Sequence, residues 1–169
     1  NLIQKFWDKL PMIISDKLKD HLIVRALRVN CLSSIYSNLW DECWSESMKD
    51  TKCLDFYPPE RSYSKLGGKW EFGYAIRDIS EREQVQCEID VLVSFLFGLG
   101  KEDLINLYRS QFPVLQKKLK DLPGQNEEDS FPRAKIMEAA YDMFLEHFGV
   151  TEKDVVAGYF QDKKKAKAA

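Results

Sequence analysis

The sequence has few of the residues that build metal centres and disulfide frameworks. Its 169 residues include four cysteines and only two histidines, His21 and His147. No two cysteines form a CxxC pair, and the histidines lie far apart, so the pattern predicts no metal site. We expect reduced thiols, and a buried thiol at Cys31, which lies in an apolar helical pattern.

Long hydrophobic runs are also missing. No apolar run reaches the roughly 18 residues that a membrane-spanning helix needs. The first residues do not show a basic segment followed by an apolar one and a small-residue cleavage site. We therefore expect a cytoplasmic protein with no membrane partner.

The sequence lacks an excess of charge of one sign. Its 25 lysines and arginines face 27 acidic residues, which gives a net charge of −2. An autonomous nucleic-acid binder is usually a basic body. Any binding to DNA must therefore use a local patch of basic side chains.

What is present is the composition of one folded domain. Hydrophobic residues make up 44% of the chain, aromatic residues 12% and charged residues 31%. These values argue against disorder, and the length suits a single core. We predict a mainly α protein with one helical domain over residues 1–162 and a disordered basic tail over 163–169.

Apolar residues at helical spacing predict a bundle of about five helices. The fourth helix should be capped by Ser130, carry Pro132 in its first turn and end at Gly149. Thr151 with Asp154 should open the last, short helix. The five segments are 16–44, 80–97, 101–112, the stretch between Ser130 and Gly149, and 151–161.

Local signals mark the ends of the middle helices. Ser80 and Glu83 have the form of a capping box, in which each side chain accepts from the other residue's backbone N–H. Gly98 is suited to the left-handed residue that ends a helix. Pro113 disfavours helical geometry at Phe112, so the third helix should end there.

The segment 45–79 interrupts the helical pattern. Pro58-Pro59 and Gly67-Gly68 mark it as a long irregular insertion. Trp70, Phe72 and Tyr74 alternate with other residues, as in a strand with one buried face. The insertion therefore either holds a short strand within 69–76 or is a functional loop, and we expect both in part.

Two short motifs resemble reaction signatures but lack their essential order. The segment DFYPPERSY, 55–63, has Tyr57 before its prolines and Glu60 after them. Amino-methyltransferases need the reverse order, a polar residue before the prolines and an aromatic one after them, to hold a flipped base. The segment GLGK, 98–101, follows a helix rather than a strand and lacks a third glycine. We identify no catalytic residue and expect no cofactor.

Asp90 lies within the apolar run EIDVLVSFLFGL. A carboxylate in such surroundings is costly unless it is paired or hydrogen-bonded. We expect it to be at least partly buried and to form a structural ion pair with an arginine, such as Arg25, Arg28 or Arg109.

Five polar residues are the candidates for contact with DNA. The helical phases predict exposed side chains at Arg25, Arg28, Lys101 and Arg109, and Gln111 follows near the end of its helix. Arginine and glutamine can make paired hydrogen bonds to phosphates or bases. Alternatively, Arg109 and Gln111 satisfy free carbonyls at the helix end.

Three segments together resemble a known family. RALRVNCLSSIYSNLW (25–40), EREQVQCEIDVLV (81–93) and LINLYRSQFPVL (104–115) look like the region after the catalytic domain in large single-chain bacterial DNA adenine methyltransferases of restriction-modification and phage-defence systems. The resemblance covers about residues 20–116. For the family it implies methyl transfer from S-adenosylmethionine to adenine N6, although this chain has neither the glycine-rich cofactor motif nor the Asn/Asp-Pro-Pro-aromatic motif.

Two functions follow as expectations. On the resemblance, the chain is an accessory module that helps a methyltransferase to hold or read duplex DNA, with the rest of a larger methyltransferase or defence-complex subunit as its partner. The alternative is a structural or protein-interaction domain with no nucleic-acid role, whose interface would be the aromatic-rich segment 40–74.

Overall fold

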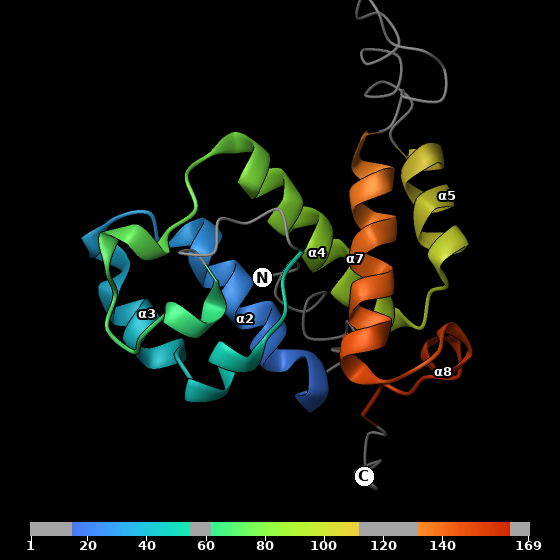
Figure 1. Cartoon of the computed structure of the whole chain (residues 1–169), viewed down its shortest axis with the longest axis horizontal. Helices are drawn as coiled ribbons and strands as arrows, with labels where there is room; N and C mark the ends of the chain where they lie inside the picture. The colour runs from blue at the N-terminus through green and yellow to red at the C-terminus, as the bar shows by residue number, and fades with distance from the viewer. Residues whose placement is uncertain (1–14, 55–61, 112–131, 163–169) are drawn as a thin grey trace, which may run out of the picture.

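The computed structural model describes residues 15–54, 62–111 and 132–162 (Figure 1). This part of the chain is mainly helical, which confirms the predicted fold class. It contains the α-helices α2 (Asp16–Asn30), α3 (Ser37–Cys43), α4 (Ile79–Phe97), α5 (Lys101–Gln111), α7 (Pro132–Phe148) and α8 (Glu152–Val156). Predictions for Phe112, Ser130 and the tail 163–169 lie outside the described residues.

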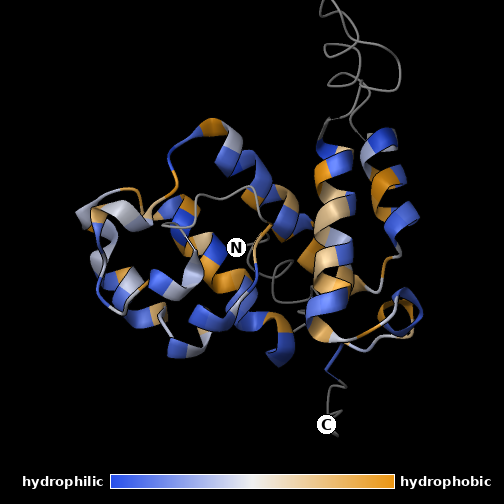
Figure 2. Ribbon diagram, viewed as in Figure 1, coloured by the Kyte–Doolittle hydropathy of each residue, from blue (hydrophilic) through white to orange (hydrophobic). Residues whose placement is uncertain are grey.

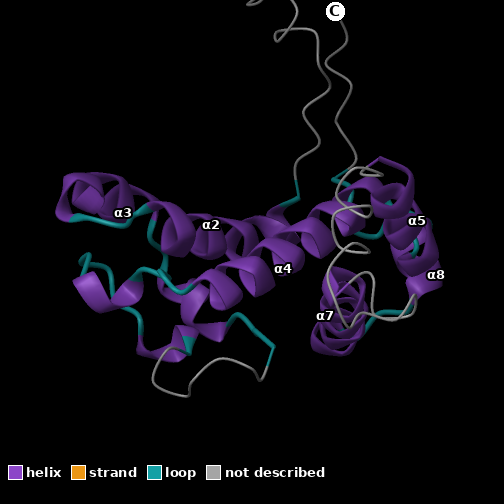
Figure 3. Cartoon of the chain, turned by 90° about the horizontal axis from the view of Figure 1, so that it is seen from above, coloured by secondary structure: helices purple, strands orange, loops and turns teal. Residues whose placement is uncertain are grey.

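Helix α4 is the centre of the arrangement. It runs beside α2 (Figures 1 and 3) and packs on its other side against α7. Helix α5 packs against α7. The larger core lies between α4, α5, α7, α8 and the beginning of α2. Phe95 lies in it against the rings of Tyr141, Phe144 and Phe160. Every one of these helices has apolar and polar segments (Figure 2), as expected for helices with a buried side.

A second, smaller core joins the C-terminal half of α2 to the irregular segment. Val24, Leu27 and Cys31 of this region pack against Trp40 and Tyr63. Helix α2 therefore contributes to both cores, since its N-terminal residue Leu18 belongs to the larger one.

The predicted helix over 16–44 is wrong as a single helix. Helix α2 stops at Asn30, and a 3₁₀-helix, Ser34–Tyr36, precedes α3. The free carbonyls at the end of α2 are taken by distant groups: Arg28 O accepts from Ile76 N at 2.8 Å, and Val29 O accepts from Arg82 at 2.8 Å. These distant donors satisfy the last carbonyls of α2, so the helix can end at Asn30. The apolar pattern in the sequence continues beyond this point although the helix does not.

The predicted strand within 69–76 is also wrong. The described residues of this segment contain a 3₁₀-helix, Phe72–Tyr74, and no strand. Trp70 and Tyr74 pack against the smaller core, whereas Phe72 is 68% exposed. The alternation therefore did not reflect one buried face.

The predicted helix ends are partly confirmed. Gly98 ends α4 with a left-handed φ of 70°, and Thr151 and Asp154 form the expected capping box of α8. The capping box at Ser80 is wrong, because Asp78 is the N-cap of α4. Its carboxylate accepts from Ser80 N at 2.9 Å and from Glu81 N at 3.1 Å.

Candidate functional site

Arg25 does not face solvent, so its predicted contact with DNA is wrong. Its side chain is fully buried, and Nε lies 2.8 Å from Oε2 of Glu88 on α4. The other nitrogens donate to the carbonyls of His21, at 2.8 Å, and of Lys52. The guanidinium thus joins α2 to α4 and to the irregular segment.

Arg28 is buried as well, which corrects its predicted exposure. It donates from Nε to the carbonyl of Tyr74 at 3.1 Å. Both arginines lie about equally far from the ring of Tyr63, with Arg25 at 5.1 Å and Arg28 at 5.0 Å from its centroid. The polar side of α2 faces the irregular segment and not solvent. Backbone carbonyls of that segment need hydrogen-bond donors, which the two arginines supply.

Glu88 is the structural residue that sequence reasoning missed. Its Oε1 accepts from Leu54 N at 3.1 Å while Oε2 binds Arg25, and the side chain is fully buried. Glu88 lies in the same apolar run that drew attention to Asp90. Two acidic residues in one apolar run were the available signal.

Asp90 pairs with an arginine, but with Arg133 and not with one of the three arginines named as examples from the sequence. Its Oδ2 lies 3.6 Å from Arg133 Nη2 and accepts from the Tyr108 hydroxyl, and the side chain remains 32% exposed. Burial raises the pKa of Asp90, although Tyr108 and Arg133 act to lower it. The carboxylate charge is therefore only partly compensated.

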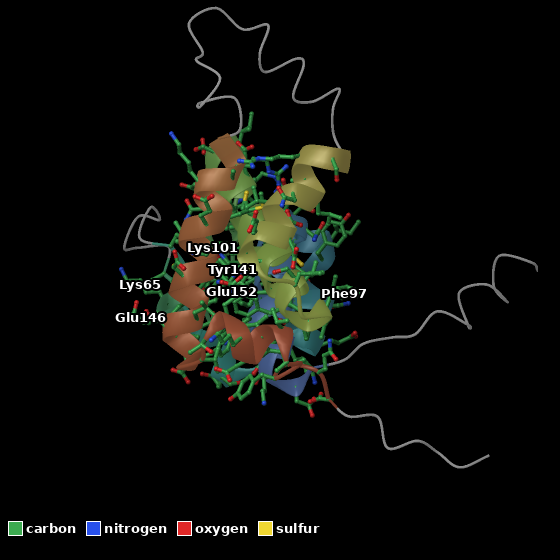
Figure 4. All side chains as sticks on the ribbon, turned by 90° about the vertical axis from the view of Figure 1, so that its right-hand side faces the viewer. Lys65, Phe97, Lys101, Tyr141, Glu146 and Glu152 are labelled. Carbon is green, nitrogen blue, oxygen red and sulfur yellow. The ribbon has the colours of Figure 1, made fainter. Side chains whose placement is uncertain are left out.

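Lys101 and Arg109 lie on a surface that also carries acids. Lys101 Nζ is 2.5 Å from Asp142 Oδ1, and its backbone N donates to Glu152 at 2.7 Å. Figure 4 shows Lys101, Tyr141 and Glu152 close together. Arg109 is exposed, and Glu138 and Glu152 line the same shallow hollow of about 360 Å³. Those carboxylates oppose a phosphate at this position.

Gln111 is the last residue of α5. Its side chain lies outside the described residues. The structure therefore brings none of the five DNA candidates together in one described basic patch.

A groove of about 440 Å³ lies between α4 and α5. Its walls are mostly apolar, and Phe97 and Leu107 on its rim are 55% and 47% exposed. Asp90 supplies its charged group, and Ser94 and Tyr108 supply its hydroxyl groups. The lining consists of Asp90, Val93, Ser94, Phe97, Leu99, Leu104, Leu107 and Tyr108.

A second, more polar cleft of about 670 Å³ separates residues 52–54 from α7. His147 lines this cleft. The ring of buried His21 lies behind it, with 5.0 Å between the centroids of the two imidazole rings. Burial lowers the pKa of His21 to about 3, and Arg25 and His147 contribute to this shift. Burial also lowers the pKa of His147, with contributions from Lys52 and Arg25. Both imidazoles are therefore neutral at pH 7.

A metal ion has no suitable ligand group in this cleft. Among the described residues, no three His, Cys, Asp or Glu side chains are placed to hold one. The positive charge of Arg25 and Lys52 near the imidazoles also disfavours a cation there.

The aromatic-rich segment 40–74 is core rather than an open interface in its described part. Trp40 is fully buried and stacks on Trp44 and Tyr74, with ring centroids 5.7 and 5.4 Å apart. Phe72 is the strongly exposed aromatic ring of the described residues there. A separate group of exposed apolar side chains, Leu32, Ile35, Tyr36 and Leu39, lies before this segment.

Comparisons with known proteins give no relative. No family model matches the chain, no curated protein matches it, and no solved structure matches it. In the part of the chain that the structure describes, no helix has both the length and the apolar character to span a bilayer.

Proposed function

We propose that the chain is a protein-interaction module without an active site of its own, which binds an amphipathic helix of a partner in the groove between α4 and α5. The observation that carries this proposal is the groove itself, an apolar trough of about 440 Å³ with exposed Phe97 and Leu107 on its rim. A groove between two helices is a common seat for a third helix, whose apolar side chains enter at a spacing of three or four residues.

Asp90 indicates which helix the groove accepts. Burial raises the pKa of its carboxylate despite Tyr108 and Arg133, so a further positive charge would stabilise it. A lysine or arginine on the partner helix supplies that charge. A hydrogen bond to a charged group contributes about 1.5–3 kcal/mol, which makes Asp90 a determinant of specificity.

The resemblance supports one partner in particular. Segments 25–40, 81–93 and 104–115 resemble the region beside the catalytic domain of adenine-specific DNA methyltransferases of restriction-modification and phage-defence type. Five of the eight residues that line the groove belong to the second and third of these segments, and the other three lie between them. The proposed partner is therefore the catalytic part of such a methyltransferase.

The test is co-expression of the tagged chain with the adenine methyltransferase catalytic chain of the same genome. We expect the two to co-purify, and we expect Leu107→Lys to abolish this because it places a charge on the groove rim. Ile35→Lys is the matched control, since Ile35 is also an exposed apolar residue but lies on α3's side of the molecule. Absence of co-purification with wild type, or equal loss in both variants, overturns the proposal.

The second candidate is the DNA-holding module. It is favoured by exposed Arg109, next to Tyr108, over whose ring Arg133 lies at 5.7 Å. Phosphate contacts release counterions, so each contact adds about 0.9 to the slope of log affinity against log salt. Titration of duplex DNA at several salt concentrations should show that slope reduced by about one in Arg109→Ala. No binding at low salt excludes this candidate for the isolated chain.

A further inference from the structure

Four apolar side chains form a stripe on the surface far from the groove. Leu32 lies just before the 3₁₀-helix Ser34–Tyr36, Ile35 and Tyr36 lie in it, and Leu39 lies in α3, so the four side chains fall within eight residues of the chain. All four are exposed, and Ile35 is 81% exposed. We call these four residues the Ile35 stripe; clustered apolar exposure of this kind marks interaction sites in soluble domains.

The Ile35 stripe stands on a well-anchored support. Trp40, the residue after Leu39, is fully buried and donates from Nε1 to the carbonyl of Gly67 at 2.9 Å. Its stacking on Trp44 and Tyr74 fixes the helix further. The stripe is therefore presented in one orientation, which lowers the entropy lost on binding.

The two ends of the stripe carry opposite charges. Arg77 lies at the Leu32 end, because it donates to the carbonyls of Leu32 and Phe72, and its guanidinium lies 3.7 Å from the Phe72 ring centroid. Glu42 lies at the other end, three residues after Leu39, and is exposed. Neither Arg77 nor Glu42 has an ion-pair partner among the residues that the structure describes.

We propose that two copies of the chain associate through the Ile35 stripe in an antiparallel, two-fold arrangement. A two-fold axis places the same surface of both copies in contact, so each residue meets its counterpart in reverse order. Arg77 of one copy then lies opposite Glu42 of the other, twice in each dimer, while Ile35 and Leu39 pack at the centre. Charges of opposite sign at opposite ends make this surface complementary to itself.

The dimer is weak. Four stripe residues with Phe72 beside them make a patch well below the roughly 800 Å² that each partner buries in a standard interface. Interfaces below the standard size are typical of weak, transient association, so the dimer should form only at high protein concentration. This surface is separate from the α4–α5 groove, so the dimer does not depend on the proposed function.

Analytical ultracentrifugation of the whole chain over the range from about 5 to 500 µM, where weak association becomes measurable, tests the dimer. We expect reversible association in wild type and a monomer in Ile35→Lys. Leu107→Lys, the matched control on the groove rim, should associate like wild type. A thermal melt of each variant checks that it is folded.

Charge exchange tests the antiparallel pairing. Glu42→Arg should weaken association at least tenfold, because it sets like charges opposite each other at both ends. The double variant Glu42→Arg/Arg77→Glu should restore it. A wild-type chain that stays monomeric throughout, or an Ile35→Lys variant that associates normally, overturns the proposal. A double variant that is not restored overturns the antiparallel arrangement.

Discussion

Replacement of Glu88 with alanine should remove about 3–5 kcal/mol from the free energy of unfolding. The cause is a guanidinium left without its counter-ion in a site from which water is excluded, since both Arg25 and Glu88 are fully buried and 2.8 Å apart. Leu54 N also loses the acceptor that it now has at 3.1 Å. A domain of this size is stable by about 5–15 kcal/mol, so the loss should be easy to measure.

The magnitude depends on which partner remains. In Arg25→Met/Glu88→Leu both charges are absent, and replacement of a buried pair by apolar residues of similar volume is often nearly neutral. The carbonyl of Lys52 then lacks this donor, and an unsatisfied buried group costs about 1–3 kcal/mol. The double variant should therefore be more stable than Glu88→Ala.

Denaturant unfolding followed by tryptophan fluorescence and far-ultraviolet circular dichroism measures these free energies. Trp40 reports on the smaller core, while the helix signal reports on the whole domain. Single variants Arg25→Met and Glu88→Leu with the double variant form a thermodynamic cycle. A coupling energy below about 0.5 kcal/mol between Arg25 and Glu88 would refute the buried ion pair as the link between α2 and α4.

Three further predictions rest on single features. The pKa of His21 is lowered from 6.5 to about 3, so below about pH 6 the unfolded chain binds a proton that the folded chain does not. The free energy of unfolding should therefore fall by about 1.4 kcal/mol per pH unit as the pH drops below about 6. Urea midpoints that do not change from about pH 7.5 to 5, or a pH dependence that is unaltered in His21→Gln, would contradict this. Asp78→Ala should lower the free energy of unfolding by about 0.5–2 kcal/mol through loss of the N-cap of α4, and Ser80→Ala should lower it by less. Equal melting temperatures for the two variants would contradict Asp78 as the N-cap. The isolated chain should bind no S-adenosylmethionine, because the sequence lacks the strand-glycine-helix turn that admits the cofactor, and micromolar binding by calorimetry would disprove it.

The features that the sequence predicted correctly are local. The left-handed turn at Gly98 and the capping box of Thr151 and Asp154 depend on residues within a few positions of one another. The helical periodicities of α4 and α7 likewise arise from neighbours along the chain. A single sequence carries this information directly, because short-range sterics and hydrogen bonds decide it.

The features that the sequence did not predict depend on distant contacts. Helix α2 ends where residues 76–82 reach its last carbonyls, and no residue near Asn30 signals that they do. The α4–α5 groove exists because two helices joined by a short turn leave space between their side chains. Residues that line it, such as Val93 and Leu104, have the same apolar pattern as residues that fill a core.

The two acids of α4 show how much of its environment the sequence did contain. Glu88 and Asp90 are two positions apart, about 200° around a helix with 3.6 residues per turn, so they must face opposite directions. Glu88 meets Arg25 of α2, while Asp90 meets Tyr108 of α5 and Arg133 of α7. A helix with costly carboxylates on both sides and apolar residues between them needs polar partners on both sides. That requirement places α4 at the centre of the fold, because only a central helix has neighbours in both directions to supply the arginines.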